Sequence, residues 1–309
     1  MDTDCIRVVD FTGVKSANDA SSAVINELHE AFTTLGFVII KAHGLEGKVD
    51  DVFKVCKEFF AYPLEEKLKY LIRETSNTSG YSYLEREKTS PDHGDLKEYF
   101  HISNCPAQIW PEKFPSFQQT VKELYSSSFE LAFTILGCMA MALKLDDPCF
   151  FTKNIKYITN LDKNKSSLRL LHYPALPDDY NIRPGQIRCG EHVDFGSITL
   201  LFPECVDGLQ VKTRDGQFLP VPRVPGAVYV NVGGTMEYWT GHRYRAVPHK
   251  VVLPDDGQQR RGRLSIPLFV HVDVDTIITS IDDSSKLPSI PAGDIYKHYM
   301  DTVFYHKEY

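Results

Sequence analysis

Paired cysteines, basic clusters and long apolar runs are missing or scarce in this sequence. The seven cysteines are odd in number and include no C-x-x-C pair, which argues against a disulfide framework and a structural zinc knuckle. Lys and Arg total 34 against 41 Asp and Glu, so the net charge is -7, and the one basic cluster, at 260–263, is short. Phosphate binding requires concentrated positive charge, so we expect no nucleic-acid partner.

The distribution of the apolar residues bears on the cellular location of the protein. No apolar run is long enough to cross a bilayer, and Met1-Asp2-Thr3-Asp4 lacks the basic and apolar regions of a secretory signal. We therefore expect a cytoplasmic monomer with reduced thiols and no membrane partner. The apolar content of 42% over 309 residues is ample for a substantial core.

The first part of the chain, residues 1–165, is predicted to be mainly helical. Apolar residues recur at three- and four-residue spacing over 20–35, 49–60 and 116–145. Ser116 and Gln119 form a capping box at the start of the longest of these helices, and Pro148 is expected to stop it.

From about Leu168 the spacing of apolar residues changes to two, which is typical of strands. The clearest predicted strands are 197–202, 227–232 and 264–270, and Asp-Gly turns stand at 207–208, 215–216 and 256–257. Many short strands favour a sandwich or jelly roll over residues 166–309, with a final helix over 294–305 packed outside it. No linker separates the two regions, so we expect one compact unit.

A metal site is the most informative chemical pattern. His192 and Asp194 are two residues apart, so in a strand their side chains point to the same face. His249 lies in a second predicted strand and is the favoured third ligand, although His242 and His271 are rivals. Two imidazole nitrogens and one carboxylate leave open positions on the ion, a set that suits non-haem Fe(II).

An anion-binding pair follows the metal pattern. Arg263 and Ser265 are also two residues apart, and a guanidinium beside a hydroxyl can receive a carboxylate. Arg260 and Arg261 stand nearby, so the alternative is that Arg263 is an ordinary charged residue of the surface. Of the three arginines, only Arg263 is followed by Ser two residues later.

These residues and several further segments resemble the 2-oxoglutarate/Fe(II)-dependent dioxygenase superfamily, in its isopenicillin N synthase-like branch. The similar segments run through nearly the whole chain in the family's order, and their spacing is the specific signal. They are Arg7–Phe11, Gly36–Gly44, Phe59–Lys67, Gly80-Tyr81, Asp95–Glu98, Tyr173-Pro174, Gly190–Gly196, Gly208–Val211, Asn231–Gly233 and Arg263–Ser265. The resemblance implies an α+β fold, a double-stranded β-helix (jelly roll) flanked by helices.

The resemblance also implies the reaction and its cofactors. His192, Asp194 and His249 would bind Fe(II), while Arg263, Ser265 and Tyr173 would hold 2-oxoglutarate by its distal carboxylate. With O2, and with ascorbate as a reductant, the family hydroxylates, desaturates or cyclises a small molecule and releases succinate and CO2.

Two features depart from the family. Plant members commonly carry Asn where this chain has Leu171, which weakens any transfer of plant substrates. The fourteen residues from His249 to Arg263 exceed the usual interval and predict a loop insertion at Pro254-Asp255-Asp256-Gly257.

The substrate-contacting residues are predicted from strand parity. Counting by twos from Arg263 puts Phe269 on the same face, and plant flavonoid-oxidising relatives have an aromatic residue at this position that stacks on substrate. Tyr81, Tyr83 and Tyr99 are candidates for the opposite wall, with core packing as the alternative for each.

Two other functions remain open at the level of sequence. One is an Fe(II) oxidase of the isopenicillin N synthase or aminocyclopropanecarboxylate oxidase type, which does not use 2-oxoglutarate and shares the Arg-x-Ser motif. The other is a non-catalytic jelly-roll protein that has kept a metal site.

Overall fold

Two sheets of unequal size face each other and form the centre of the protein. The computed structural model describes residues 5–72, 79–89, 92–103, 106, 108–205, 207–253 and 261–303. The predicted insertion at 254–257 lies outside these residues. The large sheet contains, in spatial order, β1 (Arg7–Asp10), β2 (Phe37–Lys41), β10 (Val228–Val232), β7 (Ile198–Pro203), β12 (Arg263–Val270), β5 (Ser167–Tyr173), β4 (Glu98–Ile102) and β3 (Gly80–Ser82).

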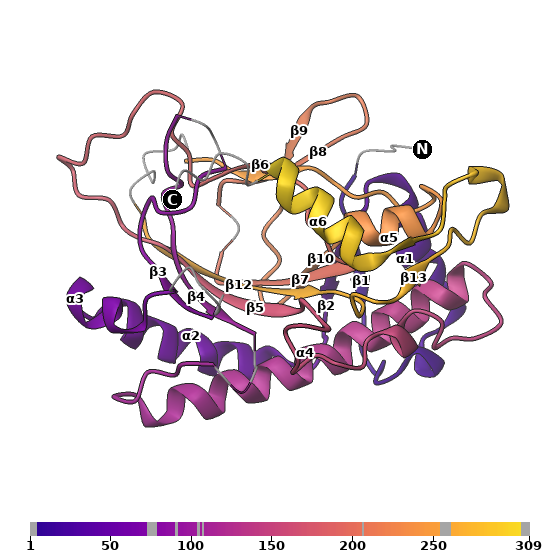
Figure 1. Ribbon diagram of the computed structural model, residues 1–309, viewed down its shortest axis with the longest axis horizontal. Helices are drawn as coiled ribbons and strands as arrows, with labels where there is room; N and C mark the ends of the chain where they lie inside the picture. Colours follow the sequence, from indigo (N-terminus) through magenta and orange to yellow (C-terminus); the bar gives the residue numbers. More distant parts are fainter. Residues whose placement is uncertain are drawn as a thin grey trace.

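The small sheet covers one face of the large one and closes the jelly roll (Figure 1). Its strands, in spatial order, are β6 (Cys189–His192), β11 (His249–Val251), β8 (Leu209–Lys212) and β9 (Phe218–Pro220). A short ribbon pairs β13 (Ile277–Ile278) with β14 (Ile290–Pro291). The strands that alternation predicts at 197–202, 227–232 and 264–270 match β7, β10 and β12 within one residue at each end.

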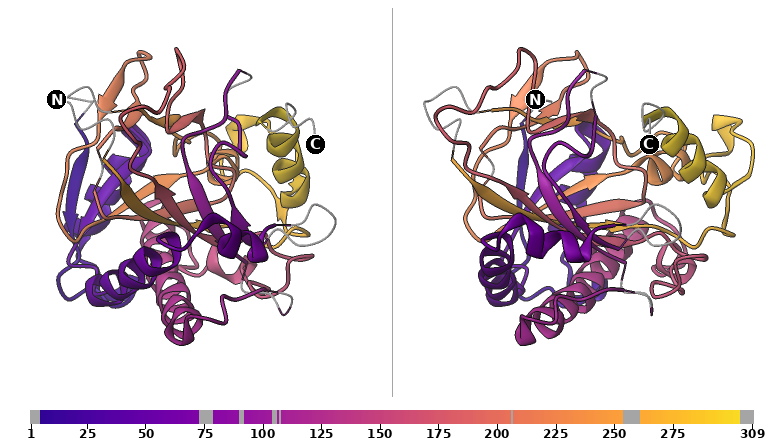
Figure 2. Two further views of the ribbon diagram at one scale, coloured as in Figure 1. Left: turned by 90° about the vertical axis from the view of Figure 1, so that its left-hand side faces the viewer. Right: turned by 60° about the vertical axis from the view of Figure 1, so that its left-hand side comes forward.

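Helices cover the opposite face of the large sheet (Figures 1 and 2). They are α1 (Ser22–Thr34), α2 (Glu46–Phe60) and α4 (Pro115–Ala142), with the short α3 (Leu64–Lys67) after α2. On the other side of the sheet lie α5 (Gly234–Trp239) and α6 (Ala292–Val303). The predicted helices at 20–35 and 49–60 therefore form, with boundaries shifted by up to three residues. The helix predicted at 294–305 forms over its described residues and begins two residues earlier.

The helix α4 differs from its prediction at both ends. Pro115 occupies the first turn, where a missing N–H is tolerated, and Phe114 caps the helix without a side-chain hydrogen bond. The predicted capping box at Ser116 is therefore wrong, because Ser116 already lies inside the helix. Its end comes at Ala142, before Pro148, and Lys144 adopts a left-handed conformation with φ of 59°.

This same helix corrects the expectation that no segment could cross a bilayer. By length and composition α4 qualifies, with a mean hydropathy of 1.3 over its most apolar 18 residues. However, 78% of that window is buried inside the protein, as in the core helix of a globular domain. The apolar side chains of α4 pack on the large sheet and on α1 and α2.

The large sheet draws strands from both halves of the chain. β1 and β2 form one edge and β4 and β3 form the other, so the mainly helical region contributes four strands that the helical periodicity does not predict. Each is too short to register as a period, and their pairing depends on β10 and β5, which come much later in the sequence.

Alternate residues along the strands of the large sheet point either into the interior of the jelly roll or into the helix-covered core. In β5, Leu168 and Leu170 are buried against the helices, whereas Arg169 and Tyr173 point between the two sheets. Successive side chains of a strand point to opposite faces, so neighbouring strands continue this division. The interior face is the one that carries the chemistry.

Candidate active site

Two histidines and one aspartate meet at the end of the small sheet. His192 ends β6, His249 begins β11, and the two are direct partners in the antiparallel register, with ring centroids 4.3 Å apart. Asp194 Oδ1 lies 3.8 Å from His192 Nε2 and 4.0 Å from His249 Nε2. The donor atoms of all three lie within 4.8 Å of one another, so one metal ion could contact all three.

Backbone carbonyls orient both imidazoles toward this centre. His192 Nδ1 lies 2.9 Å from the carbonyl oxygen of Gly190, and His249 Nδ1 lies 3.1 Å from that of Val247. A ring nitrogen that faces a carbonyl oxygen carries the proton, so each Nε2 keeps its lone pair. Contacts of this kind fix the ring orientation of metal-binding histidines.

The Asp194 carboxylate is buried, and its two oxygens face different partners. Asn231 Nδ2 donates to Oδ2 at 2.7 Å, which leaves Oδ1 facing the histidines. Burial raises the pKa of Asp194, but His249 and His192, together with hydrogen bonds from Thr199 and Asn231, hold this pKa below its usual value. Burial, and then the neighbouring His192, lower the pKa of His249 to about 4. At neutral pH an anionic oxygen therefore stands beside a neutral His249 nitrogen.

The two rival histidines lie elsewhere. His242 sits in a turn with φ of 64°, its side chain is 60% exposed, and it is 4.0 Å from Glu237. His271 is half-buried and lines the cavity beside Asp194, yet its ring nitrogens are outside the converging group. The geometry therefore favours His249 as the third donor.

Arg263 and Tyr173 form a second polar centre. They are direct partners of β12 and β5, and the guanidinium carbon lies 4.5 Å from the centre of the tyrosine ring. Arg263 Nη1 donates to the carbonyl oxygen of Cys205 at 2.6 Å. Its buried Nε has no hydrogen-bond partner among the residues that the structure describes. Ser265 lies two residues on and is also buried, so a buried cation and a hydroxyl stand side by side.

A second guanidinium flanks Tyr173, and no sequence pattern indicates it. Arg188 is 1% exposed, and its guanidinium carbon lies 5.7 Å from the ring centre. Burial, followed by the nearby charge of Arg263, lowers the pKa of Arg188 to about 10. Burial also raises the pKa of Tyr173, so its hydroxyl keeps its proton. Two cations around a neutral phenol favour an anion at this end of the interior.

Comparisons with known proteins bear directly on this arrangement. Residues 6–120 match the family described as non-haem dioxygenase in morphine synthesis N-terminal, and residues 164–272 match the 2OG-Fe(II) oxygenase superfamily. A 2-oxoglutarate-Fe(II) type oxidoreductase of Metarhizium rileyi is 31% identical over 85% of this chain and 80% of that protein. The chain belongs to the 2OG-Fe(II) oxygenase superfamily.

Two further comparisons agree with this assignment. A proline hydroxylase of Petromyces alliaceus is 31% identical to this oxygenase over 82% of each chain. A full-length Neurospora crassa protein, solved in complex with alpha-KG (2-oxoglutarate) and thymine, superposes with a TM-score of 0.83 at 26% identity, covering 96% of this chain and 97% of that one. The expected jelly-roll α+β fold is confirmed, and the protein is a non-haem dioxygenase that uses Fe(II), 2-oxoglutarate and O2.

A cavity of about 390 Å³ opens beside His192 and Asp194 in the oxygenase. This volume is suited to a small molecule. Phe269 and Tyr99 both line it, each from an inward-facing position of its strand. Their contact with a substrate stays a prediction, but both lie where such a contact is possible.

The other two tyrosines do not line the cavity, and their predicted place is wrong. Tyr81 is the direct partner of Phe100, and cross-strand partners share a face of the sheet, so both point into the helix-covered core. The Tyr81 hydroxyl there donates to Glu98. Tyr83 lies beyond the end of β3 with 40% of its surface exposed, and the guanidinium carbon of Arg86 lies 5.7 Å from the centre of its ring.

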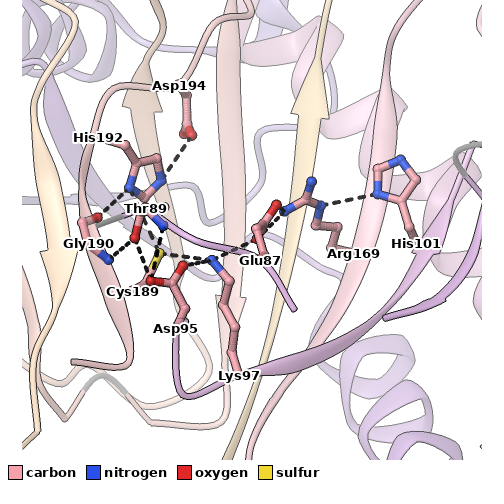
Figure 3. Close-up of polar contacts among 10 residues, drawn as sticks. All are labelled: Glu87, Thr89, Asp95, Lys97, His101, Arg169, Cys189, Gly190, His192 and Asp194. Carbon is pink, nitrogen blue, oxygen red and sulfur yellow. Dashed lines mark hydrogen bonds and ion pairs between the residues drawn. The ribbon is translucent and has the colours of Figure 1, made fainter. Parts of the chain in front are cut away.

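A chain of polar contacts leads away from the metal-binding centre (Figure 3). The Gly190 carbonyl oxygen contacts His192, and the Gly190 N–H donates to Thr89 Oγ1 at 2.6 Å. Thr89 Oγ1 in turn donates to Asp95 Oδ1 at 2.6 Å. The loop that carries Thr89 is therefore tied to the strand that carries His192.

The chain continues along the cavity wall as a row of charges (Figure 3). Lys97 Nζ lies 2.8 Å from Asp95 Oδ2 and 2.8 Å from Glu87 Oε2, and all three side chains are buried. The Glu87 carboxylate also faces Arg169 Nη1 at 3.3 Å, and Arg169 Nε donates to His101 Nδ1 at 3.1 Å. None of these residues receives a role from the sequence patterns. A usable signal existed for Arg169, which is four residues before Tyr173 and so shares its face of β5.

Proposed function

We propose that His192, Asp194 and His249 bind the Fe(II) of this oxygenase. The support is the convergence of two oriented Nε2 atoms and one carboxylate oxygen within 4.8 Å. Two nitrogens and one carboxylate on one side of the ion match the donor set of non-haem Fe(II) oxygenases. The carbonyl contacts behind each ring and the Asn231 contact behind the carboxylate hold this set in place.

We propose that Arg263, Ser265 and Tyr173 bind the distal carboxylate of 2-oxoglutarate. The observation that carries this proposal is the buried Arg263 Nε without a partner among the described residues. A buried donor is usually satisfied, so an incoming carboxylate oxygen is the partner that its chemistry calls for. Arg188 adds a second positive charge beside the same tyrosine.

When bound, Fe(II) with 2-oxoglutarate and O2 supplies the oxidant, releasing succinate and CO2. The residues of the protein then have geometric tasks. Phe269 and Tyr99 restrict where a substrate can lie in the cavity, and the enclosing sheets exclude water. Hydroxylation of a C–H bond near the centre is the proposed outcome, and desaturation or ring closure remain the alternatives.

A small molecule is the substrate class that the cavity supports. The relative named as a proline hydroxylase and the Neurospora crassa structure that contains thymine are consistent with a polar small molecule. Every residue that the proposal needs lies in one chain, which is consistent with a monomer. The six described cysteines are unpaired, which is consistent with a cytoplasmic protein. Membership of the isopenicillin N synthase-like branch is likewise proposed from the resemblance.

The test combines metal binding with product analysis. Purified apoprotein is titrated anaerobically with Fe(II), and succinate is then measured after addition of 2-oxoglutarate, O2 and ascorbate. His192→Ala, Asp194→Ala and His249→Ala should each lose tight iron binding and succinate formation, whereas His242→Ala should resemble the wild type. Near-normal activity of any of the first three variants would refute the metal assignment.

The same assay separates the oxidase alternative. An oxidase that does not use 2-oxoglutarate would consume O2 with a substrate and form no succinate. Products are identified by incubating metabolite extracts with Fe(II) and 2-oxoglutarate and searching for compounds that gain one oxygen atom or lose two hydrogen atoms.

A further inference from the structure

Arg169 is a partly buried arginine that the iron and 2-oxoglutarate sites do not use. It lines the cavity from β5, and its guanidinium carbon lies 4.5 Å from the centre of the Tyr99 ring and 5.6 Å from that of Phe269. Two aromatic rings therefore hold the guanidinium within the same cavity that contains His192 and Asp194.

The hydrogen bonds of Arg169 leave one nitrogen unused. Nε donates to His101 Nδ1 and Nη1 faces both oxygens of Glu87, whereas Nη2 has no hydrogen bond to any residue that the structure describes. In Figure 3 this nitrogen is the one without a dashed line, and it points away from both partners. A guanidinium carries donors only, so the group that completes it must be a hydrogen-bond acceptor.

The surrounding charges indicate what kind of acceptor fits. Lys97 and Arg169 are balanced by Glu87 and Asp95, so this row of four charges has no net charge. Burial, followed by the nearby Arg169, lowers the pKa of His101 to about 3, so His101 adds no charge at neutral pH. Asp162 and Lys165 also line the cavity and carry one charge of each sign. A neutral hydrogen-bond acceptor leaves this balance unchanged, whereas a substrate carboxylate would add a negative charge for which this wall offers no further cation among the described residues.

We propose that Arg169 Nη2 anchors the substrate by donating to the carbonyl oxygen of a neutral ring compound, such as a lactam or an imide. This inference rests on the proposed function, because it assigns the substrate side of the same cavity. The rings of Tyr99, Phe269 and Tyr296 line the cavity and offer faces and edges to a flat, partly apolar molecule. Glu87 and His101 position the guanidinium so that Nη2 remains available.

The first experiment measures binding without turnover. The protein is loaded with Mn(II) and 2-oxoglutarate under anaerobic conditions, and its melting temperature is followed against three probes of similar size: 2-piperidone, glutarimide and cyclohexanecarboxylate. The two neutral probes should raise the melting temperature at millimolar concentration, and the carboxylate should not. A preference for the carboxylate, or no binding of either neutral probe, would overturn the proposal.

Variants then test the residue itself. Arg169→Met should weaken binding of the neutral probes by roughly tenfold to a hundredfold, which is the usual effect of losing a hydrogen bond to a charged group. Arg169→Lys keeps the charge beside Glu87, but a lysine cannot reach all three partners, so this variant should also bind the neutral probes more weakly. It takes the place of Arg169→Met in the test if the Met variant does not fold. The matched control is Arg183→Met, which removes an arginine paired with Glu85 near the surface.

These experiments distinguish a failure of this inference from a failure of the proposed function on which it rests. Succinate formation by wild-type protein without any probe reports on the iron and 2-oxoglutarate sites alone. If it is present and both Arg169 variants bind the neutral probes as tightly as wild type, the anchor is wrong and the oxygenase assignment stands. If wild type binds neither Fe(II) nor 2-oxoglutarate, the proposed function fails first.

Discussion

Asn231 donates a hydrogen bond to Oδ2 of Asp194, while Oδ1 of the same carboxylate faces the two histidines. The amide thereby decides which oxygen is available to a metal ion. It also holds a buried anion in place, because Asp194 is only 6% exposed.

The first prediction follows from this contact. Asn231→Ala should weaken Fe(II) binding by about 10- to 100-fold, the usual effect of losing a contact behind a metal ligand. The measurement is an anaerobic Fe(II) titration, with the exposed Asn181→Ala as control. Unchanged iron affinity in Asn231→Ala would mean that the carboxylate is oriented by other contacts.

Arg263 should determine the requirement for 2-oxoglutarate. Removing one partner of a buried charge pair costs about 2–5 kcal/mol, so Arg263→Ala should raise the 2-oxoglutarate concentration needed, with Fe(II) binding retained. Arg263→Lys should be impaired less, because lysine keeps the charge without the planar fork. Arg261→Ala is the control, since it keeps the backbone carbonyl oxygen that accepts from Arg188. A variant that changes only the substrate requirement would assign Arg263 to the substrate instead.

Phe269 should affect product formation more than 2-oxoglutarate binding. Its ring lines the cavity and contacts Arg169, so Phe269→Ala should reduce the product formed per succinate released. The ratio of product to succinate is the measurement, once a substrate is known. An equal loss of substrate coupling and 2-oxoglutarate binding would point to a role in folding.

Tyr81 should matter for stability and leave catalysis intact. Its hydroxyl donates to the buried Glu98, which Lys67 contacts at 2.9 Å and His172 at 2.7 Å. Tyr81→Phe should therefore lower the free energy of unfolding by about 1–3 kcal/mol. Urea denaturation measures this change, and the exposed Tyr83→Phe should have little effect. If Tyr81→Phe instead needed a higher substrate concentration, the result would show that Tyr81 contributes to the cavity.

Acidification should destabilise the apoprotein through His101. Its pKa is about 3 in the folded protein because burial and Arg169 oppose protonation, whereas an unfolded histidine titrates near the ordinary value of 6.5. Between these values the unfolded state binds more protons, so folding stability falls as pH falls, by about 1.4 kcal/mol per pH unit for one such histidine. The free energy of unfolding of His101→Gln should depend less steeply on pH between about 6 and 4.5. An equal slope in both proteins would place this titration elsewhere.

Local patterns are sufficient for much of the fold and of the candidate site. The Arg-x-Ser pair lies within the single strand β12, as its spacing predicts, whereas Asp194 lies two residues beyond the end of β6 and is not placed beside His192 by strand parity. The structure nevertheless brings His192, Asp194 and His249 together. The strand register that pairs His249 with His192 depends on tertiary structure, and the sequence indicates it only through the order of the family's motifs.

Other parts depend on pairings that no local pattern contains. The sequence suggests the cavity for Tyr81 because nothing in its own segment reveals that its partner is Phe100. Glu87 and Thr89 belong to an irregular loop, so no periodicity predicts the side to which they point. Their contacts with Arg169 and Gly190 join segments 82 and 101 residues apart in the chain.

The four strands contributed by the first part of the chain have a consequence for folding. They form both edges of the large sheet, so a fragment beginning at residue 166 would expose the unpaired backbone of β10 on one side and of β5 on the other. Such edges are templates for aggregation. The pairing of β2 with β10 also closes a loop of nearly two hundred residues, which slows folding because distant contacts form late. The iron-binding half should therefore be insoluble when expressed alone and should regain solubility when residues 1–165 are supplied as a separate chain.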